Sequence, residues 1–296
     1  MNITPSQIPK MSMYTYKISC VIILAAMVIP LTAQSPWAQG KGKGYGQILF
    51  NTIPTYAGVF GGSEGLRQTE RFISETILAP FAEVGVTDHL TFSATVPLIL
   101  VSTGDPSSVD LVPSLPADRL SSLGNISFST KYSVGKGAWK FALNPRVDIP
   151  TSTRNDVSGL STGVDAWTIQ PAASAGKSGE DWFYYGFFGY GFRSDEHNDF
   201  LNYGVEAGKA LNDKVTFILN VSRLESINNG NRSVDSPANI ETGLFTSFQE
   251  YTGYIIKFFV KEIYKDFGAF ISLGGGFNAD SVAASPALSL GIFRKW

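Results

Sequence analysis

The sequence has little of the chemistry on which soluble enzymes and nucleic-acid-binding proteins depend. Among its 296 residues there are one cysteine, Cys20, and two histidines, His89 and His197, and charged residues make up 16% of the chain. A formal net charge of −2 gives no electrostatic basis for binding nucleic acid or an anionic surface. Cys20 lies in an N-terminal segment that we expect to be removed. The exported chain then has no disulfide and depends on a large hydrogen-bonded framework.

Long apolar runs are also scarce. Residues 18–32 form an apolar run that is preceded by Lys10 and Lys17 and followed by small residues at Ala33 and Ala38. This pattern is typical of a secretory signal peptide, with cleavage after Ala33 or Ala38. The alternative is a membrane anchor. It is disfavoured because fifteen apolar residues are short against the roughly 20 that a spanning helix needs.

We therefore divide the chain into a cleaved signal peptide, residues 1–38, and one exported domain, residues 39–296. No stretch of the exported domain reaches the roughly 18 consecutive apolar residues of a membrane helix. If this domain lies in a membrane, it must do so as a closed barrel, because lipid cannot satisfy the hydrogen bonds of an open sheet.

The exported domain is rich in segments in which polar and apolar residues alternate strictly. In the stretch GVTDHLTFSATVPL, residues 85–98, the hydroxyl residues Thr91, Ser93 and Thr95 alternate with apolar residues. Successive side chains of a strand point to opposite faces, so this segment predicts a strand with one apolar face. Similar segments predict about twelve strands, near 44–60, 72–87, 90–102, 124–134, 138–150, 166–176, 181–193, 200–210, 214–224, 250–263, 267–278 and 285–296.

The connections between these segments alternate in length. Long connections at 61–71, 103–123, 151–165 and 225–249 alternate with short ones such as TDH and GKG. This wiring is typical of a transmembrane antiparallel up-and-down β-barrel with short periplasmic turns and longer extracellular loops. We predict such an all-β fold in the outer membrane of a Gram-negative bacterium, with both termini periplasmic. A soluble β-sandwich remains the alternative, because both folds bury one face of each strand.

Charged residues recur in mid-strand on the face opposite the apolar one. In a barrel this face is the lumen, and it lines a path for solutes or closes the lumen through ion pairs. The candidates are Glu83, Lys131, Lys140, Arg146, Asp148, Glu206 and Lys257. Lys209 and Arg294 fall on the apolar face instead, but each lies near a strand end, where a charge costs only about 0–1 kcal/mol.

The last segment ends on an aromatic residue. Leu290, Ile292 and the terminal Trp296 share one face, in a pattern that resembles the signal read by the barrel assembly machinery. Arg294 departs from that pattern, in which an apolar residue is usual. The expected partners are this machinery, outer-membrane lipid and lipopolysaccharide, and a small hydrophobic solute, with no nucleic acid.

Residues 75–99, ETILAPFAEVGVTDHLTFSATVPLI, resemble the second hairpin of a family of Gram-negative outer-membrane proteins described as meta-pathway phenol-degradation proteins and related to hydrophobic-compound channels. The shared positions are Glu83, Gly85, Thr87, Asp88 and Pro97. The segments LGNISFSTKYSV and QGKGKGYGQI also resemble that family, and the resemblance covers about residues 40–150. It implies a channel or transport barrel for small, hydrophobic or aromatic compounds that diffuse passively.

Two alternatives belong to other functional classes. A structural or adhesion barrel would have a plugged lumen and act through loops 103–123 and 225–249. A lipid-modifying enzyme would need a serine beside His89 or His197, and neither histidine falls on a strand face next to one. The acidic loop RSDEHND does not match a calcium-binding pattern, and we expect no cofactor and no metal site.

The barrel and the soluble sandwich differ in how the exported chain behaves without detergent. We expect the chain to remain with the membrane fraction and to be extracted only by detergent, because its apolar strand faces contact lipid. Fractionation of expressing cells measures this directly. A chain that is recovered in the soluble fraction contradicts the barrel.

Overall fold

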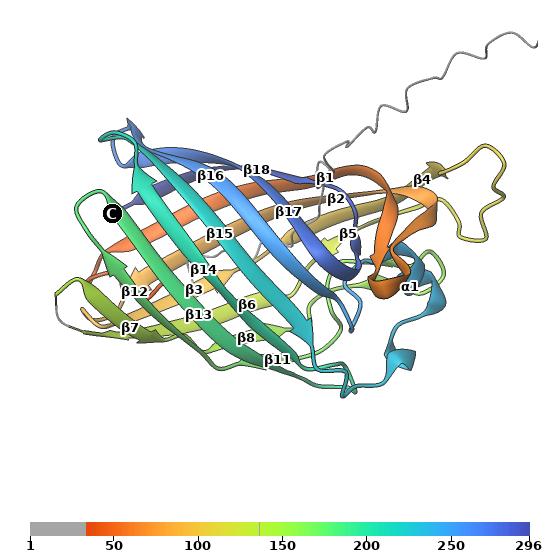
Figure 1. Ribbon diagram of the computed structural model, residues 1–296, viewed down its shortest axis with the longest axis horizontal. Helices are drawn as coiled ribbons and strands as arrows, with labels where there is room; N and C mark the ends of the chain where they lie inside the picture. Colours follow the sequence, from red (N-terminus) through yellow and green to blue (C-terminus); the bar gives the residue numbers. More distant parts are fainter. Residues whose placement is uncertain (1–33, 136) are drawn as a thin grey trace, which may run out of the picture.

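The computed structural model describes residues 34–135 and 137–296, and the predicted signal segment up to residue 33 lies outside them. Within the described ranges, no helix has both the length and the apolar character needed to cross a membrane. The described residues form a single barrel of antiparallel strands, with short turns at one end and larger loops and a helix at the other (Figure 1).

The wall is built from continuous strands and from crossings made of two strands in line. The continuous strands are β1 (Gly44–Gly61), β2 (Leu66–Gly85), β13 (Trp182–Arg193), β14 (Phe200–Ala210), β15 (Val215–Ser226), β16 (Glu250–Tyr264), β17 (Phe267–Ala283) and β18 (Ala287–Lys295). The two-part crossings are β3 (Leu90–Thr95) with β4 (Leu98–Pro106), β5 (Asp118–Leu123) with β6 (Ile126–Val134), β7 (Trp139–Leu143) with β8 (Arg146–Ile149), and β11 (Thr168–Gln170) with β12 (Ala172–Ser178).

The first and last strands close the ring. Strand β18 pairs antiparallel with β1 from Tyr45 opposite Lys295 to Thr52 opposite Leu288. Beyond this ladder, the N–H of Gly44 donates to the carbonyl of Trp296 at 3.0 Å, and the N–H of Trp296 donates back at 3.1 Å. The described strands therefore form a closed antiparallel ring of about twelve crossings, as the alternation predicted.

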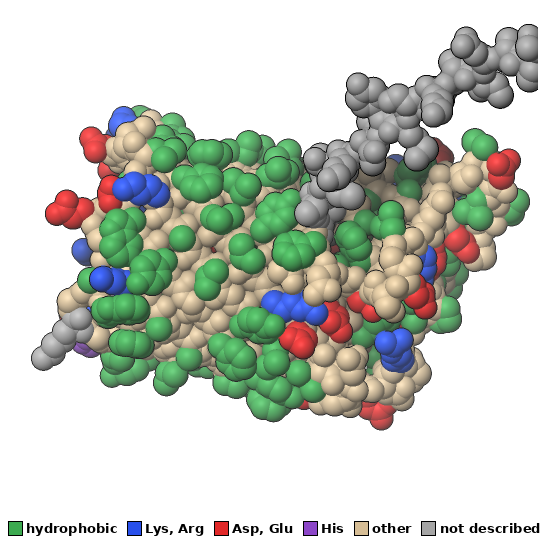
Figure 2. All heavy atoms as spheres, in the orientation of Figure 1, with side chains coloured by type: hydrophobic (Ala, Val, Ile, Leu, Met, Phe, Trp, Pro, Cys, Tyr) green, Lys and Arg blue, Asp and Glu red, His purple; other side chains and the backbone are tan. Residues whose placement is uncertain are grey.

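Each strand sends one face into the lumen and one to the outside. In β3, Thr91 and Ser93 are 1% and 6% exposed, whereas Phe92 between them is 42% exposed. Figure 2 shows hydrophobic side chains distributed over the outer wall, with charged side chains gathered mainly toward the two ends. The apolar face of the alternating segments is thus the outer face, and the hydroxyl face is the lumen.

Proline explains most of the two-part crossings. Pro97, Pro145 and Pro171 each lie between the two strands of a crossing, where the missing N–H interrupts the ladder. Their carbonyls still accept hydrogen bonds. Gly124 donates to Pro97 at 2.8 Å, and Tyr190 donates to Pro171 at 3.1 Å. The wall therefore remains hydrogen-bonded across these interruptions.

Lys209 and Arg294, which the sequence placed on the apolar face, both lie on the outer face at the end with the short turns. The ammonium of Lys209 lies 2.5 Å from Asp181, and the guanidinium of Arg294 lies 4.0 Å from Asp266. All four side chains are more than half exposed. These cations thus lie close to water and a carboxylate rather than at the middle of the outer wall.

The loop end differs from the sequence prediction. Residues 61–71 were predicted as a long loop, which is wrong, because η2 (Gly62–Glu64) turns the chain and β2 already begins at Leu66. The predicted loop 151–165 contains a hairpin of β9 (Arg154–Asn155) and β10 (Leu160–Ser161). The predicted loop 225–249 contains η3 (Arg232–Val234) and α1 (Pro237–Thr242).

Close packing of glycine against an aromatic ring makes the wall sensitive to a single methyl group. A Cβ at Gly268 would overlap the ring of Phe293 and the carbonyl oxygen of Val260. We expect Gly268→Ala to lower the free energy of unfolding by about 1–3 kcal/mol, measured by urea titration of the protein in lipid vesicles. Gly186→Ala is the control, because its nearest atom would lie 3.6 Å away. Equal effects of the two changes would contradict this assignment.

Candidate functional site

One side of the lumen is mainly apolar, although Asn51, Glu75, Ser272 and Ser289 are buried polar side chains on the same strands. Buried hydrophobic side chains of β1, β2, β4, β17 and β18 pack into one cluster that extends from the turn end to the loop end. We call these residues the apolar stripe: Tyr45, Leu49, Ile53, Ile73, Ile77, Ala79, Phe81, Ile99, Val101, Phe270, Ala287 and Phe293. The prediction of a polar lumen is therefore wrong for this side of the barrel. Alternation identifies two faces but does not require the inward one to be polar at every strand.

The facing side of the lumen is polar. We call its inward residues on β6, β7, β8, β11, β12, β14 and β15 the polar wall: Ser127, Lys131, Ser133, Asn144, Arg146, Asp148, Gln170, Ser174, Asn202, Glu206 and Asn220. The lumen is thus amphipathic, with an apolar stripe opposite a wall of hydrogen-bonding groups.

The charged residues proposed from the sequence are arranged mainly in pairs of opposite sign. Glu83 and Lys131 lie 3.6 Å apart, and each side chain is only 4% exposed. The Arg146 Nε lies 2.6 Å from Asp148 Oδ1, and the Ser127 hydroxyl donates to the same oxygen at 2.6 Å. Each buried charge in these pairs is compensated within the wall.

The remaining three candidates occupy two places. Glu206 and Lys257 are buried in the lumen and attract each other electrostatically. Lys140 lies apart from them, near the turn that follows β6, where its ammonium donates to the carbonyl of Gly135 at 2.9 Å. The structure thus brings Glu206 and Lys257 together and leaves Lys140 near the rim.

Residues 34–39, which we call the luminal segment, lie inside the barrel along the polar wall. Lys131 Nζ donates to the Ser35 hydroxyl at 3.1 Å and to the Trp37 carbonyl at 3.2 Å. The Ser133 hydroxyl and the Asn144 amide donate to the carbonyls of Pro36 and Gln34, at 2.5 and 3.1 Å. The pair of Lys131 and Glu83 therefore anchors a segment that the sequence assigned to the signal peptide.

Near the rim the chain is fixed by the turn GVTDH. Gln39 donates its N–H to Thr91 at 2.8 Å and its side-chain amide to Glu83 at 2.5 Å. Asp88 accepts the N–H of Lys41 at 3.1 Å, while the Thr87 hydroxyl accepts the N–H of His89 and closes the turn. The side chains of Thr87 and Asp88 thus serve to fix the turn.

A cavity of about 520 Å³ lies between the luminal segment and the wall. Trp37 forms its aromatic edge, with ring centroids 5.8 Å from Phe183 and 5.7 Å from Tyr185 in edge-to-face geometry. We call it the luminal cavity. Its lining is Ser35, Trp37, Ala38, Gln39, Tyr45, Glu83, Ser178, Phe183, Tyr185, Glu206, Thr216, Ile218, Phe259, Lys261 and Lys295.

At the loop end the lumen is closed by residues 232–249, which we call the cap. Arg154 on the β9–β10 hairpin donates to the carbonyl of Val234 at 2.8 Å and lies 3.4 Å from Asp235. Burial raises the pKa of Asp235 even though Arg154 faces it. Leu244 of the cap packs on the apolar stripe together with Leu160 of the hairpin.

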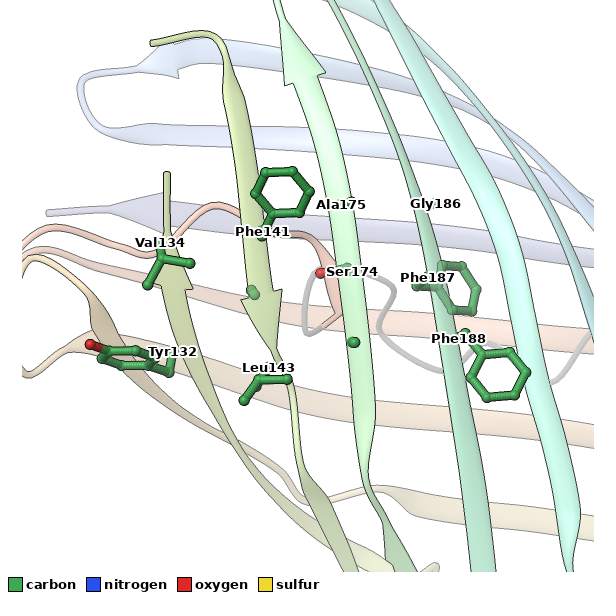
Figure 3. Close-up of a pocket in the computed structure, with 11 residues that line it drawn as sticks. Tyr132, Val134, Phe141, Leu143, Ser174, Ala175, Gly186, Phe187 and Phe188 are labelled. Carbon is green, nitrogen blue, oxygen red and sulfur yellow. The ribbon is translucent and has the colours of Figure 1, made fainter. Parts of the chain in front are cut away.

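A second hollow lies on the outer wall, with a volume of about 650 Å³. Figure 3 shows the rings of Phe141 and Phe188 on either side of the small residues Ala175 and Gly186. Strand β12 is paired with β7 and with β13 along this hollow, so the wall is continuous beneath it. Its position on the apolar outer face makes it a contact for lipid chains rather than a part of the lumen.

The histidines do not form a nucleophile–base pair. His89 Nδ1 lies 3.1 Å from the Ser133 carbonyl, and His197 Nδ1 lies 3.2 Å from the Asp195 carbonyl. Burial lowers the pKa of His197. Asp199 of the same loop accepts hydrogen bonds from Arg193, Tyr190 and Asn229. In the part of the chain that the structure describes, no cluster of metal-ligand residues is found.

Comparison with known proteins identifies a family. The family model described as "Putative MetA-pathway of phenol degradation" matches residues 62–246, more than half of the chain. This match extends well beyond residue 150, where the resemblance in sequence motifs ends. No curated protein matches the sequence.

Three solved structures of outer-membrane proteins are similar to this chain to different degrees. The COG4313 outer membrane channel from Pseudomonas putida F1 has a TM-score of 0.68 at 13% identity, over 91% of this chain and 100% of that chain. The CymD monoaromatic hydrocarbon channel has a TM-score of 0.45 at 10% identity, over 87% of this chain and 89% of that one. The toluene transporter TbuX from Ralstonia pickettii has a TM-score of 0.43 at 10% identity, over 87% and 90%. The first of these shows that the fold is that of an outer-membrane β-barrel.

The two predicted cleavage points lead to different lumens. A chain that begins at Gln34 retains the luminal segment, whereas a chain that begins at Gln39 lacks Trp37 and its neighbours. We expect the shorter chain to have the larger single-channel conductance in a planar bilayer, because removal of the segment widens the lumen at the turn end. Both chains are refolded from the same detergent, so that folding yield is matched. Equal conductances would contradict a narrowing role for this segment.

Proposed function

The chain belongs to the family of the MetA pathway of phenol degradation, and on this premise we propose that it is an outer-membrane channel through which small, largely apolar solutes diffuse passively. Aromatic compounds are the solute class that the family description favours. The Pseudomonas putida relative, whose fold this chain shares, is itself described as an outer membrane channel.

The observation that carries this proposal is the apolar stripe. It continues from Tyr45, which lines the luminal cavity, through Leu49 and Ala79 toward the loop end. An apolar solute gains roughly 25 cal/mol for each Å² of its surface that leaves water, and this gain is available along the whole stripe. A solute in the lumen is thus offered apolar contact without having to cross a layer of exposed charge.

The charges of the lumen favour a neutral solute. Glu83 and Lys131 compensate each other, and so do Arg146 and Asp148. Apart from Glu75 on β2 and from Lys261 and Lys295 beside the luminal cavity, the luminal charges are paired, so they present no continuous row of cations or anions to a permeating ion. This arrangement is the opposite of a charge-lined pore that selects ions by sign.

The topology supports an orientation and a set of partners. The ring of strands begins near Gly44 and ends at Trp296, both at the end with the short turns, which in outer-membrane barrels is the periplasmic end. The cap and the larger loops then face the cell exterior. The exposed outer-wall residues Leu290, Ile292 and Trp296 on and after β18 are the proposed signal for the barrel assembly machinery. The outer wall contacts membrane lipid, with lipopolysaccharide at the loop end.

The closed cap favours a second function from another class. A plugged barrel that serves envelope structure or adhesion has a sealed lumen, and the cap seals this one at the loop end. The loop between β4 and β5 projects beyond the wall, with Val109 and Val112 100% and 93% exposed, and offers a contact surface for such a role (Figure 1). The two functions differ in whether a solute crosses the barrel.

A bulky residue on the apolar stripe tests passage. Ala79 on β2 faces the lumen and is 5% exposed, whereas Ala82 on the same strand faces outward. In host cells with a lipopolysaccharide outer leaflet, we expect expression of the barrel to raise uptake of radiolabelled toluene. Ala79→Trp should return uptake to the level of cells without the barrel, because the indole fills the path.

Ala82→Trp is the matched control and should leave uptake unchanged, since its side chain lies in lipid. Heat-modified migration on gels checks that both variants fold. Uptake that is the same with and without the wild-type barrel would sink the channel and leave the plugged structural barrel.

A further inference from the structure

We propose that Tyr185, Glu206 and Asn220 form a binding site for the hydroxyl group of an aromatic alcohol or phenol, with the aromatic ring held in the luminal cavity. The inference rests on the proposed channel function and specifies which solutes the channel distinguishes. The three residues would discriminate a hydroxylated arene from an aromatic hydrocarbon of the same size.

The three residues lie side by side across neighbouring strands. Tyr185 on β13 is the register partner of Glu206 on β14, and Glu206 is the register partner of Asn220 on β15. All three face inward, and they are 1%, 9% and 1% exposed. Tyr185 and Glu206 line the luminal cavity, and Asn220 is the next inward-facing position after Ile218, which also lines it.

These three side chains, which we call the row, have hydrogen-bonding groups that are only partly satisfied. The Tyr185 hydroxyl donates to the Glu206 carboxylate, and Lys257 attracts the same carboxylate. The side-chain amide of Asn220 faces Glu206, yet neither its oxygen nor its nitrogen has a hydrogen bond of good geometry to any described residue. Buried polar groups in native proteins are almost always paired, so an amide in this state indicates a ligand or an ordered water.

The charges of the row select a neutral group that both donates and accepts. Within the row, a carboxylate or phenolate would be repelled by Glu206 and an ammonium by Lys257, while the cations Lys261 and Lys295 lie elsewhere in the cavity lining. A hydroxyl group is neutral and is repelled by neither residue. It can donate a hydrogen bond to the Glu206 carboxylate and accept one from the Asn220 amide. Hydrogen bonds to an ionised acceptor are stronger than those between neutral groups.

The aromatic part of the solute is matched by the cavity edge. Trp37 packs edge-to-face on both Phe183 and Tyr185, so aromatic surface lies directly beside Glu206. A single ring with one hydroxyl group fits a cavity of about 520 Å³. Trp37 belongs to the luminal segment, so the segment contributes a wall of the site as well as narrowing the lumen.

Trp37 also serves as the fluorescent probe for a binding measurement. It faces the lumen, whereas Trp139, Trp167, Trp182 and Trp296 lie on the outer wall or its rim. Phenol and toluene are titrated into the purified protein that begins at Gln34, and tryptophan quenching is recorded. Trp37→Phe defines the background from the outer tryptophans, and the difference reports occupancy of the cavity.

We expect phenol to bind more tightly than toluene in the wild-type protein. Glu206→Gln and Asn220→Leu should each weaken phenol binding roughly tenfold, as expected for a hydrogen bond to a buried group, and change toluene binding by less than about twofold. Asn202→Leu is the matched control, because Asn202 is an inward-facing asparagine of β14 that, unlike Asn220, is not the register partner of Glu206. Heat-modified migration on gels checks folding, and Glu206→Gln preserves the shape of the side chain if Asn220→Leu fails to fold.

The outcomes separate this site from the channel itself. Phenol and toluene binding that fall by the same factor, or a phenol preference that survives both substitutions, would overturn the hydroxyl site and leave the toluene uptake experiment unaffected. Absence of any Trp37-dependent quenching by phenol would also overturn it. Loss of phenol preference together with unchanged toluene binding supports the assignment, whatever the rate of uptake.

Discussion

The whole structure depends on one constraint, which is that no backbone N–H or carbonyl of the wall can be left unpaired in lipid, where each such group costs several kcal/mol. The ladder between β1 and β18 is the place where this constraint is finally met, because it removes the two free edges of the sheet. The contacts between Gly44 and Trp296 extend that ladder to the last residue of the chain. Closure in turn creates a lumen, and it separates each strand into a lipid face and a luminal face.

The inner and outer faces of the wall differ in how polar residues are distributed. The outer face is mainly apolar because its surroundings are uniform, whereas the inner face is divided between the apolar stripe and the polar wall. The polar wall holds the luminal segment through Lys131, Ser133 and Asn144. The stripe is left facing the remaining space. Hydrogen bonding on one side therefore makes the other side available for an apolar solute.

The sequence predicted the barrel well and the lumen poorly, for physical reasons. Alternation in segments such as 90–95 and 126–134 follows directly from the pleat, and even the strand ends agree closely at 200–210. The luminal segment escaped prediction because six residues without periodicity look like the end of a signal peptide. Helix α1 is six residues long, too short to show a helical period, although Ser236 and Gly243 at its ends are typical caps.

The role of individual site residues was the hardest part to predict, and Glu83 shows why. Its inward position follows from alternation, but its contacts with Lys131 and Gln39 join residues 48 and 44 positions apart. Trp37 gave no signal at all, because an aromatic residue near a cleavage point has no pattern of its own. Closure of the ring determines which distant residues meet, and local patterns in the sequence do not show these contacts.

The cap and the wall are held by different kinds of contact. The wall is held by continuous backbone ladders, whereas the cap is joined to the barrel through side chains such as Arg67 to the Ile240 carbonyl, Arg154 to Val234 and Tyr56 to Thr242. Segments with fewer backbone hydrogen bonds open at lower free-energy cost than the ladders of a sheet. Water at the mouth can replace the polar contacts of the cap, but lipid cannot replace those of the wall. The contacts of the cap therefore cost less free energy to break than the ladders of the ring.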